Sequence, residues 1–337
     1  MSKTKLYLFL IAALLVFLVP QVFWGSEKPD DFTMSQIFPI DRGHSYIGFS
    51  VKYMGFAYVR GRFEDFSGSI RYDETDITKT SATVIIKTAS IDTDHDFRDR
   101  DLKSANWFDA ENFPTIMFQT TEVVKQESGV EVIGDLTIRG VTKEISLKLE
   151  GKSGLQKDVR DDTQIIFTGS TVIDRTEFGV KGERWSRLKE GIAAVVSEVK
   201  IELSILAKQI NESNFRNRVR NVERPPGKIY KIVAETGVDA ALKEFNTMKS
   251  ESENSVNEGV LNVVGYMLLK EGKVDDAISV FKHNAKTYPE SVNVYDSLGE
   301  AYGVKGDHET AIKFYKIVLE KDALNANAME VLRHLKN

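Results

Sequence analysis

Cysteine is absent from this chain of 337 residues. Its absence excludes disulfides, thiolate zinc sites, cysteine nucleophiles and a lipidated N-terminal cysteine. An excess of charge of one sign is nearly absent too, because the net charge is only −5. Since nucleic-acid-binding proteins usually have a basic face, this balance gives no support to nucleic-acid binding. The G-x-S-x-G, H-E-x-x-H and G-x-x-x-x-G-K-[ST] motifs are also missing, and we predict that the protein is not an enzyme.

Histidine is scarce, with five in the chain. The acidic run Asp92–Asp96 resembles the start of a calcium loop, but an EF-hand needs glycine at its sixth position and glutamate at its twelfth. Phe97 and Lys103 occupy those positions. His95, between aspartates, is more typical of a solvated side chain than of a metal ligand. We therefore predict no metal site and no cofactor.

Residues 1–25 contain the longest apolar run. Lys3 and Lys5 precede an apolar stretch from Leu6 to Val19, as in a secretory signal. The stretch is shorter than the roughly 18 residues of a spanning helix. The sequence favours a cleaved signal over a retained anchor formed by residues 6–24. Either alternative predicts an exported protein of the periplasm or cell envelope.

Residues 36–208 alternate between apolar and polar side chains. The alternation is regular in Val130–Ile138, Ile145–Leu149 and Val199–Ile205. One apolar face per strand is typical of antiparallel sheets, whereas strands of parallel sheets are apolar on both faces. These residues are predicted to form an antiparallel sandwich or barrel. The irregular stretch 98–116 is expected to form a short helix and loop over one end of it.

The composition changes after residue 208. Residues 209–228 have no apolar period and end in Pro225-Pro226-Gly227, which predicts a linker or a loose first helix. The segment is basic, and one interpretation is contact with an anionic membrane surface. A solvated linker is the other. The arginines concerned are Arg216, Arg218, Arg220 and Arg224.

Residues 229–337 have a helical period and an internal repeat. Gly265, Ala277 and Phe281 recur 34 residues later as Gly299, Ala311 and Tyr315. The stretch GVDAALKEF forms an earlier, degenerate copy. This sequence resembles the tetratricopeptide repeat (TPR), which has small residues at the positions where its two helices touch. The resemblance implies a stack of helical hairpins that could dock a protein partner, although a stabilising tail without a partner remains an alternative.

A second resemblance covers Pro39 to Ala207. It rests on HSYIGFSVKYMGFAYVRGRFEDF, ASIDTDHDFRDRDLKSANWFD, FPTIMF, GDLTIRGVTKEISL and IDRTEFGV, in that order. These blocks strongly resemble the YceI family, whose members are lipocalin-like barrels that hold long isoprenoid lipids. Tyr53 and Asp101 stand where the family often has histidine, so a role for those histidines in headgroup binding is not carried over.

The YceI resemblance implies a lipocalin-like β-barrel of about eight strands around one ligand. An isoprenoid tail, such as that of a polyprenyl phosphate or quinone, would need an apolar and aromatic lining. The expected lining is Phe49, Val51, Met54, Phe56, Phe63, Phe108, Phe113, Phe118, Leu136, Ile138, Phe167 and Phe178. Cationic candidates for the headgroup are Arg60, Arg98, Lys103 and Arg175. For Arg98 and Arg175, an ion pair with Asp99 or Asp174 is the competing hypothesis.

Three functions follow from these observations. The first is an exported carrier of an isoprenoid lipid, with TPR hairpins that dock a partner. The second is a hydrolase or isomerase that acts on a lipid in the cavity, which predicts a polar dyad inside the barrel, for instance a carboxylate near His44. The third makes the repeats a scaffold and the barrel a filled structural body. The interior of the barrel distinguishes the three.

Overall fold

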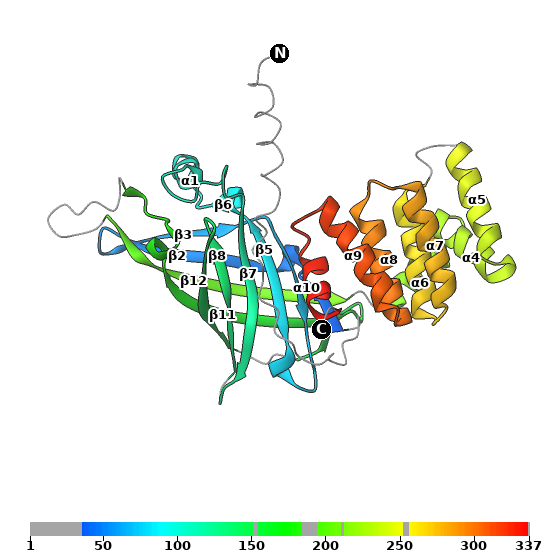
Figure 1. Ribbon diagram of the computed structural model, residues 1–337, viewed down its shortest axis with the longest axis horizontal. Coiled ribbons are helices and arrows are strands. Elements are labelled where there is room, and N and C mark those ends of the chain that lie inside the picture. The colour runs from blue at the N-terminus through cyan, green and yellow to red at the C-terminus, as the bar shows by residue number, and fades with distance from the viewer. Residues whose placement is uncertain are drawn as a thin grey trace, which may run out of the picture.

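The structure is a computed structural model that describes residues 36–127, 129–150, 154–183, 194–209, 212–251 and 256–335. A curled sheet lies beside a stack of helices, and the last helix lies between them (Figure 1). The predicted export segment, residues 1–25, lies outside the described ranges. Within those ranges, no helix is both long and apolar enough to cross a membrane.

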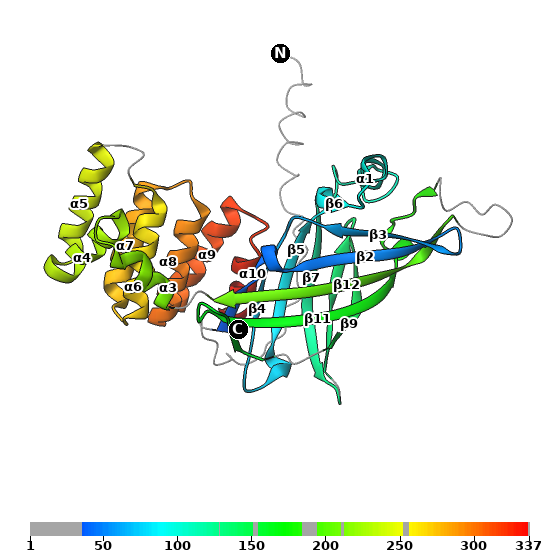
Figure 2. The same cartoon turned by 180° about the vertical axis from the view of Figure 1, so that it is seen from behind.

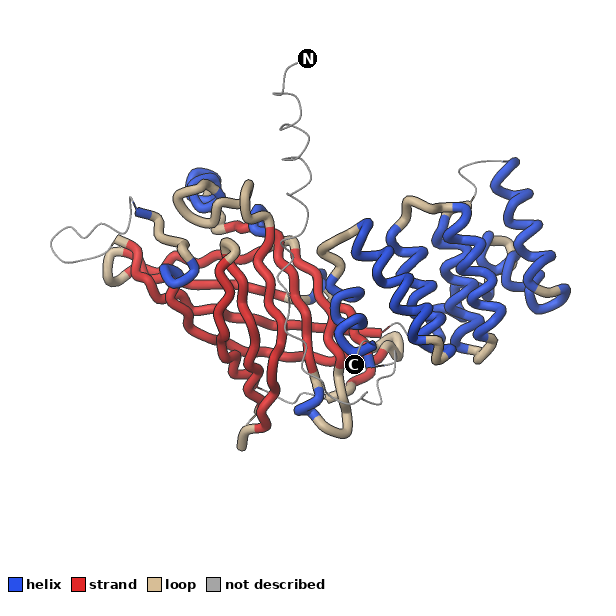
Figure 3. The backbone as a smooth tube through the Cα atoms, in the orientation of Figure 1, coloured by secondary structure: helices blue, strands red, loops and turns tan. Residues whose placement is uncertain are grey.

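The sheet is antiparallel and holds twelve strands within the described residues. Its order is β1-β4-β5-β7-β8-β9-β11-β12-β2-β3-β6, and β10 pairs with β11 outside this path. The strands are β1 (Ile37–Pro39), β2 (Tyr46–Tyr53), β3 (Ala57–Phe63), β4 (Phe66–Arg71), β5 (Ser81–Lys87), β6 (Ile91–Asp92), β7 (Thr115–Lys125), β8 (Val130–Ile138), β9 (Val141–Glu150), β10 (Gln156–Lys157), β11 (Thr163–Asp174) and β12 (Val195–Gln209). The long strands wrap around a common interior (Figure 3).

The prediction of a barrel of about eight strands is wrong. The sheet forms a half-barrel, and its end strands β1 and β6 do not pair with each other along the described path. β1, β6 and β10 have only two or three residues each, too few to show an alternating pattern in the sequence. The antiparallel, one-faced character of the sheet is confirmed.

α1 (Asp96–Lys103) covers the end of the sheet near β3 and β6, and short 3₁₀ turns lie at other strand ends (Figure 1). α1 is the predicted helix, and its first turn is capped by the Nδ1 atom of His95. The single turn η6 (Arg175–Phe178) follows β11. The remaining 3₁₀ turns are η3 (Arg42–His44), η4 (Ile77–Lys79) and η5 (Thr88–Ser90). α1 stands above the edges of the strands in Figure 1.

The helical region contains α3 (Glu212–Arg220), α4 (Pro225–Thr236), α5 (Val238–Glu251), α6 (Glu258–Lys270), α7 (Val274–Thr287), α8 (Val292–Lys305), α9 (His308–Lys321) and α10 (Ala326–Leu335). The TPR-like repeat is confirmed, because α6–α7 and α8–α9 are consecutive hairpins. A Cβ added at Gly265 would lie 2.5 Å from the ring of Phe281, and one at Gly299 would lie 2.8 Å from the ring of Tyr315. The small and aromatic residues of each repeat therefore touch.

The predicted linker at residues 209–228 is largely helical. α3 occupies much of it, and α4 begins at Pro225, where the fixed φ of proline suits the first turn of a helix. Val219 of α3 is buried in a small cluster with Val263 and Met267 of α6. Val219 therefore attaches α3 to α6.

The sheet and the helices share a junction at α10, which packs on β4 and β5 (Figure 2). Glu330 of α10 is fully buried and accepts hydrogen bonds from the hydroxyls of Ser81 and Thr83. His334 lies 2.9 Å from the same carboxylate. Burial acts to raise the pKa of Glu330. The hydrogen bonds of His334 and Ser81 and the charges of His334 and Arg333 together outweigh burial and hold the pKa below its usual value. The junction therefore contains a buried charge whose partners come from both regions.

Candidate functional site

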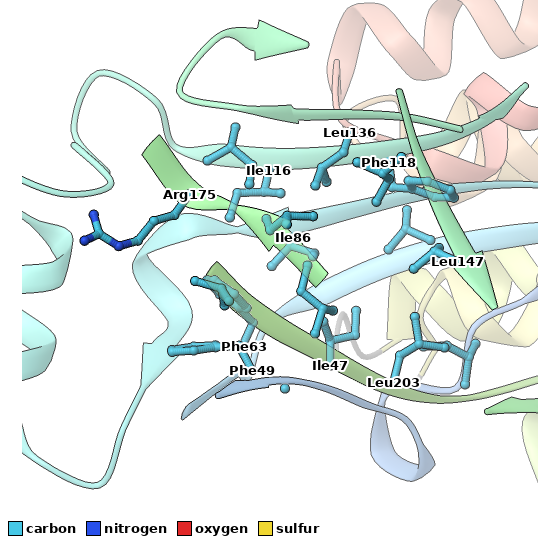
Figure 4. A pocket seen from close by; sticks show the side chains of 18 of the residues that line it. Ile47, Phe49, Phe63, Ile86, Ile116, Phe118, Leu136, Leu147, Arg175 and Leu203 are labelled. Carbon is cyan, nitrogen blue, oxygen red and sulfur yellow. The ribbon is translucent and has the colours of Figure 1, made fainter. Parts of the chain in front are cut away.

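The half-barrel encloses a cavity of about 770 Å³. Its walls follow the two-residue period of the strands: Ala82, Val84 and Ile86 of β5 face the cavity, while Thr83 and Ile85 lie on the outer face. Apolar side chains from opposite walls converge on the same space in Figure 4, among them Ile47, Leu136 and Leu203. A pocket of this size and lining suits a largely apolar organic ligand.

Polar side chains on the cavity wall come from two places. His95, Arg98 and Asp101 belong to α1 or precede it, and Arg175 begins η6. Thr80, Ser81 and Thr120 come from the start of β5 and the middle of β7. Phe97 of α1 lines the cavity although it is 75% exposed, so the cavity reaches the surface at α1.

Comparison with known proteins identifies the sheet. The family model of the YceI-like domain matches residues 38–207. The chain belongs to the YceI-like family. A UPF0312 protein of Photorhabdus laumondii is 36% identical over 147 residues, which are 44% of this chain and 76% of that protein.

Two solved structures are similar to separate parts of the chain. A polyisoprenoid binding domain from Saccharophagus degradans is 15% identical and covers 51% of this chain and 98% of its own, with a TM-score of 0.39. The second TPR domain of human RPAP3, solved with an HSP70 peptide, is 15% identical and covers 34% of this chain and 95% of its own, with a TM-score of 0.26.

Ten of the sixteen residues predicted from the sequence as ligand contacts line the cavity of the YceI-like domain. They are Phe49, Val51, Phe63, Arg98, Phe108, Phe118, Leu136, Ile138, Phe167 and Arg175. The rings of Phe49, Phe63 and Phe108 form a chain of contacts, with centroids 5.9 Å and 6.1 Å apart. These three rings narrow the cavity near its polar α1 end.

The other six lie elsewhere. Lys103 belongs to the last turn of α1 and does not line the cavity. Met54 and Phe56 are in the exposed turn between β2 and β3, where Met54 has a φ of 52° and Phe56 is 81% exposed. Arg60 points outward, because it alternates with the inward Val59 on β3. Phe113 packs beneath the guanidinium of Arg139. Phe178 is the last residue of η6, and its side chain is buried. Family position suggested these residues, but the local turn or strand register directs them away from the cavity.

Arg175 is bonded to the backbone. Its guanidinium donates to the carbonyl oxygens of Val180 and Lys181 over 2.6 Å and 2.7 Å, and to those of Val195 and Val196 over 3.1 Å. In Figure 4 the guanidinium points away from the apolar side chains. Burial lowers the pKa of Arg175. Arg175 thus fastens η6 to the start of β12, which neither sequence hypothesis for this residue included.

Arg98 differs from Arg175 in exposure and bonding. It is half-buried on α1 and donates to the hydroxyl and carbonyl of Thr93 over 2.7 Å and 2.8 Å. Asp99 also binds Thr93 rather than Arg98, because it accepts from the backbone N–H and hydroxyl of Thr93. The structure therefore shows Thr93 shared between the two side chains in place of the expected ion pair. Arg98 remains a cationic group at the open end of the cavity.

The site prediction omitted one whole wall of the cavity. This wall comprises aliphatic residues of β9 and β12: Ile145, Leu147, Leu149, Val199, Ile201, Leu203 and Ile205. The two-residue alternation marks every one of them in the sequence. Trp107, which is 5% exposed and also lines the cavity, has no such signal because it lies in the loop after α1.

The cavity bears on the two alternative functions. A filled barrel was the premise of the scaffold hypothesis, and the cavity shows that premise to be wrong. For the enzyme hypothesis, His44 does lie 3.0 Å from the carboxylate of Asp41, but neither residue lines the cavity. Among the described residues there is also no group of three side chains able to hold a metal ion.

Proposed function

We propose that the YceI-like domain binds an isoprenoid lipid, of the polyprenyl phosphate or quinone type, in the cavity of its half-barrel. The observation that carries the proposal is the cavity of about 770 Å³ between apolar walls. An isoprenoid tail offers only methyl, methylene and olefin groups, and burying each CH₂-sized unit contributes roughly 0.8 kcal/mol. The aliphatic side chains of the strands and the rings of Phe49, Phe63 and Phe108 match that chemistry.

The proposed position of the headgroup is the α1 end. Three polar side chains there are not fully buried: Arg98, His95 and Asp101. Asp101 accepts a hydrogen bond from Trp107 Nε1, and the guanidinium of Arg98 suits a phosphate or a quinone oxygen. Phe97, which stands at the same end and is largely exposed, is placed to contact a tail as it enters. In this arrangement the tail would lie among the strands and the headgroup beside α1.

The proposal includes export and a docking role for the helices. The N-terminal sequence supports a location in the cell envelope, where isoprenoid carriers of this type would meet their ligand. The TPR-like hairpins support recruitment of a protein partner. Arg216, Arg218, Arg220 and Arg224 are exposed on α3 and before α4, so contact with an anionic membrane stays a prediction.

The test is native mass spectrometry of protein purified gently from its membrane-containing host, followed by organic extraction. We expect a bound mass that extracts as an isoprenoid. An empty protein that also fails to take up added polyprenyl lipid would contradict the proposal.

Two matched tryptophan variants locate the ligand. Ala82→Trp would place an indole inside the cavity, because Ala82 lines it on β5. Val172→Trp would place the same group on the outer surface of β11, where Val172 is 59% exposed. We expect at least a tenfold loss of bound lipid in the first variant, equivalent to about 1.4 kcal/mol, and no loss in the second. Equal lipid content in both variants would place the ligand outside the cavity.

A further inference from the structure

The two complete repeats differ in chemistry at three matching positions. Asn262, Tyr266 and Phe281 of the first repeat correspond, 34 residues on, to Asp296, Glu300 and Tyr315 of the second. The second repeat thus has two carboxylates where the first has an amide and a phenol. It also has a hydroxyl where the first has none. These differences gather acceptor oxygens in one hairpin.

The three side chains are close to one another and to the neighbouring hairpin. The hydroxyl of Tyr266 donates to Glu300 Oε2 over 2.7 Å, and Asn327 Nδ2 donates to Asp296 Oδ1 over 2.9 Å. Tyr266 and Glu300 belong to α6 and α8, the first helices of the two hairpins, and Asn327 belongs to α10, which follows them. The carboxylates therefore lie on the face that these first helices share.

Tyr315 adds an unused polar atom to this cluster. Its ring packs on Gly299 and its side chain is fully buried, yet its hydroxyl has no hydrogen-bond partner. Burial and the charges of Asp296 and Glu300 raise the pKa of Tyr315. The Tyr315 ring lies beside this pair because it packs on Gly299, the residue that precedes Glu300. A buried hydroxyl without a partner costs about 1–3 kcal/mol, which a bound donor would recover.

Neither carboxyl group has a cation beside it among the described residues. No lysine or arginine nitrogen of the described residues lies within 4.0 Å of Asp296 or Glu300, although both side chains are half-buried. Lys270, an exposed residue of α6, is the cation that acts on Glu300 from a greater distance. A half-buried pair of carboxyl groups that lacks a cation is suited to receive one, because a bound cation stabilises their ionised forms.

We propose that the oxygens of Asp296, Glu300 and Tyr315 bind the ammonium group of a lysine from a partner protein. An ammonium has three N–H donors and no acceptor, and these side chains offer three acceptor groups. The inference rests on the proposed docking role of the repeats and names the chemistry of the partner.

A segment of this chain already lies on the face of the first helices. α3 already lies on α4 and α6, where Val219 contacts the cluster that includes Tyr266 (Figure 2). The shared face thus binds α3 at one end. Tyr266 contacts the α3 cluster and also donates to Glu300, so the two places are adjacent. The proposed lysine site continues the same surface.

The test uses the full chain and two fluorescein-labelled peptides of serine and alanine, one with a central Lys-Lys pair and one with Gln-Gln. Fluorescence anisotropy at low ionic strength measures their binding. We expect the lysine peptide to bind more tightly than the glutamine peptide. In Asp296→Asn/Glu300→Gln, the affinity for the lysine peptide should fall at least about tenfold, because charge-assisted hydrogen bonds are lost. Tyr315→Phe should weaken it by a smaller factor.

The control is Glu309→Gln/Glu320→Gln, which removes the same charge from exposed positions of α9. It should bind the lysine peptide within about twofold of the wild type. No binding by the wild type up to about 1 mM, no preference for lysine, or an equal loss in the control would overturn the proposal. Tighter binding of free spermidine than of the peptide would overturn the assignment to a protein partner. Lipid content, measured on the same samples, reports on the cavity separately.

Discussion

The half-barrel and the helical repeats differ in how closely their apolar side chains pack: those of the half-barrel surround a cavity, and those of the repeats touch. Ala82 and Val84 line a wall that faces empty space, whereas the α-carbon of Gly265 lies so close to Phe281 that a single added carbon would collide. The curvature of a sheet is set by its backbone ladder, so side chains on opposite walls need not meet. Helices in a hairpin can approach until their side chains touch. The comparison shows that a hollow and a filled core can coexist in one chain.

The junction between the regions gives the largest expected effect. Glu330→Ala removes a buried carboxylate that binds Ser81, Thr83 and His334, and should lower the free energy of unfolding by about 3 kcal/mol. Urea denaturation measures the change, and separate transitions for sheet and helices are expected once the junction is lost. Glu309→Ala, at an exposed position, is the control. A change below about 0.5 kcal/mol in Glu330→Ala would show that the two regions do not stabilise each other.

The filled region should not tolerate even one added carbon. Gly265→Ala places a methyl 2.5 Å from the Phe281 ring, and we expect a loss of about 1–3 kcal/mol from overpacking. Thermal denaturation of Gly265→Ala and Gly299→Ala measures it, with Ser279→Ala on the exposed face of α7 as the matched helix control. Stability equal to the control would mean that the hairpins are loosely packed. The lipid content should not change.

The hollow region should tolerate a much larger addition. Ala82→Trp directs its ring into the cavity of about 770 Å³ and not into a packed contact, so we expect its free energy of unfolding to stay within about 1 kcal/mol of the wild type. Ala277→Trp makes the same change at a fully buried helix contact and should be far more damaging. Urea denaturation of the two variants compares the regions directly. Equal losses would show that the cavity collapses when no ligand is bound.

The sequence predicted those parts of the fold that depend on repeated patterns. The alternation in residues 130–149 and 199–205 corresponds to β8, β9 and β12, and the 34-residue spacing corresponds to the two hairpins. Strands of two or three residues such as β6 and β10 have no pattern to detect. The count of strands, and with it the closure of the barrel, therefore could not be read from the chain.

The candidate site divides along the same line. Phe49, Val51 and Leu136 face the cavity, because alternation along a strand alone decides on which side of the sheet each side chain lies. Arg175 and Phe56 could not be placed, since a turn of the backbone determines whether a guanidinium meets carbonyl groups or a ring meets solvent. The junction at Glu330 pairs residues about 250 positions apart, and no local feature of either segment indicates it.

The smallest expected effect concerns pH and the polar face of the filled region. Burial raises the pKa of Glu300 to about 7 and that of Asp296 to about 6, although hydrogen bonds from Tyr266 and Asn327 and the charge of Lys270 oppose the shift. The folded state then holds protons that the unfolded state has released. The stability that these two carboxyls contribute is present in full below their unfolded values of 4.5 and 3.8, and is lost as pH rises through 6 and 7.

Asp296→Asn/Glu300→Gln should remove that part of the pH dependence. The asparagine reproduces Asn262 of the first repeat, so we expect the variant to fold and to be at least as stable as the wild type at pH 8. Urea denaturation at pH 5 and pH 8 measures the difference for both proteins, and the wild type should lose more stability on going to pH 8. Identical losses would mean that the carboxylates are solvated in the free protein. A variant less stable than the wild type at pH 8 would mean that the two carboxylates stabilise the fold. That result would contradict a lysine site, which requires carboxylates that lack a cation within the protein.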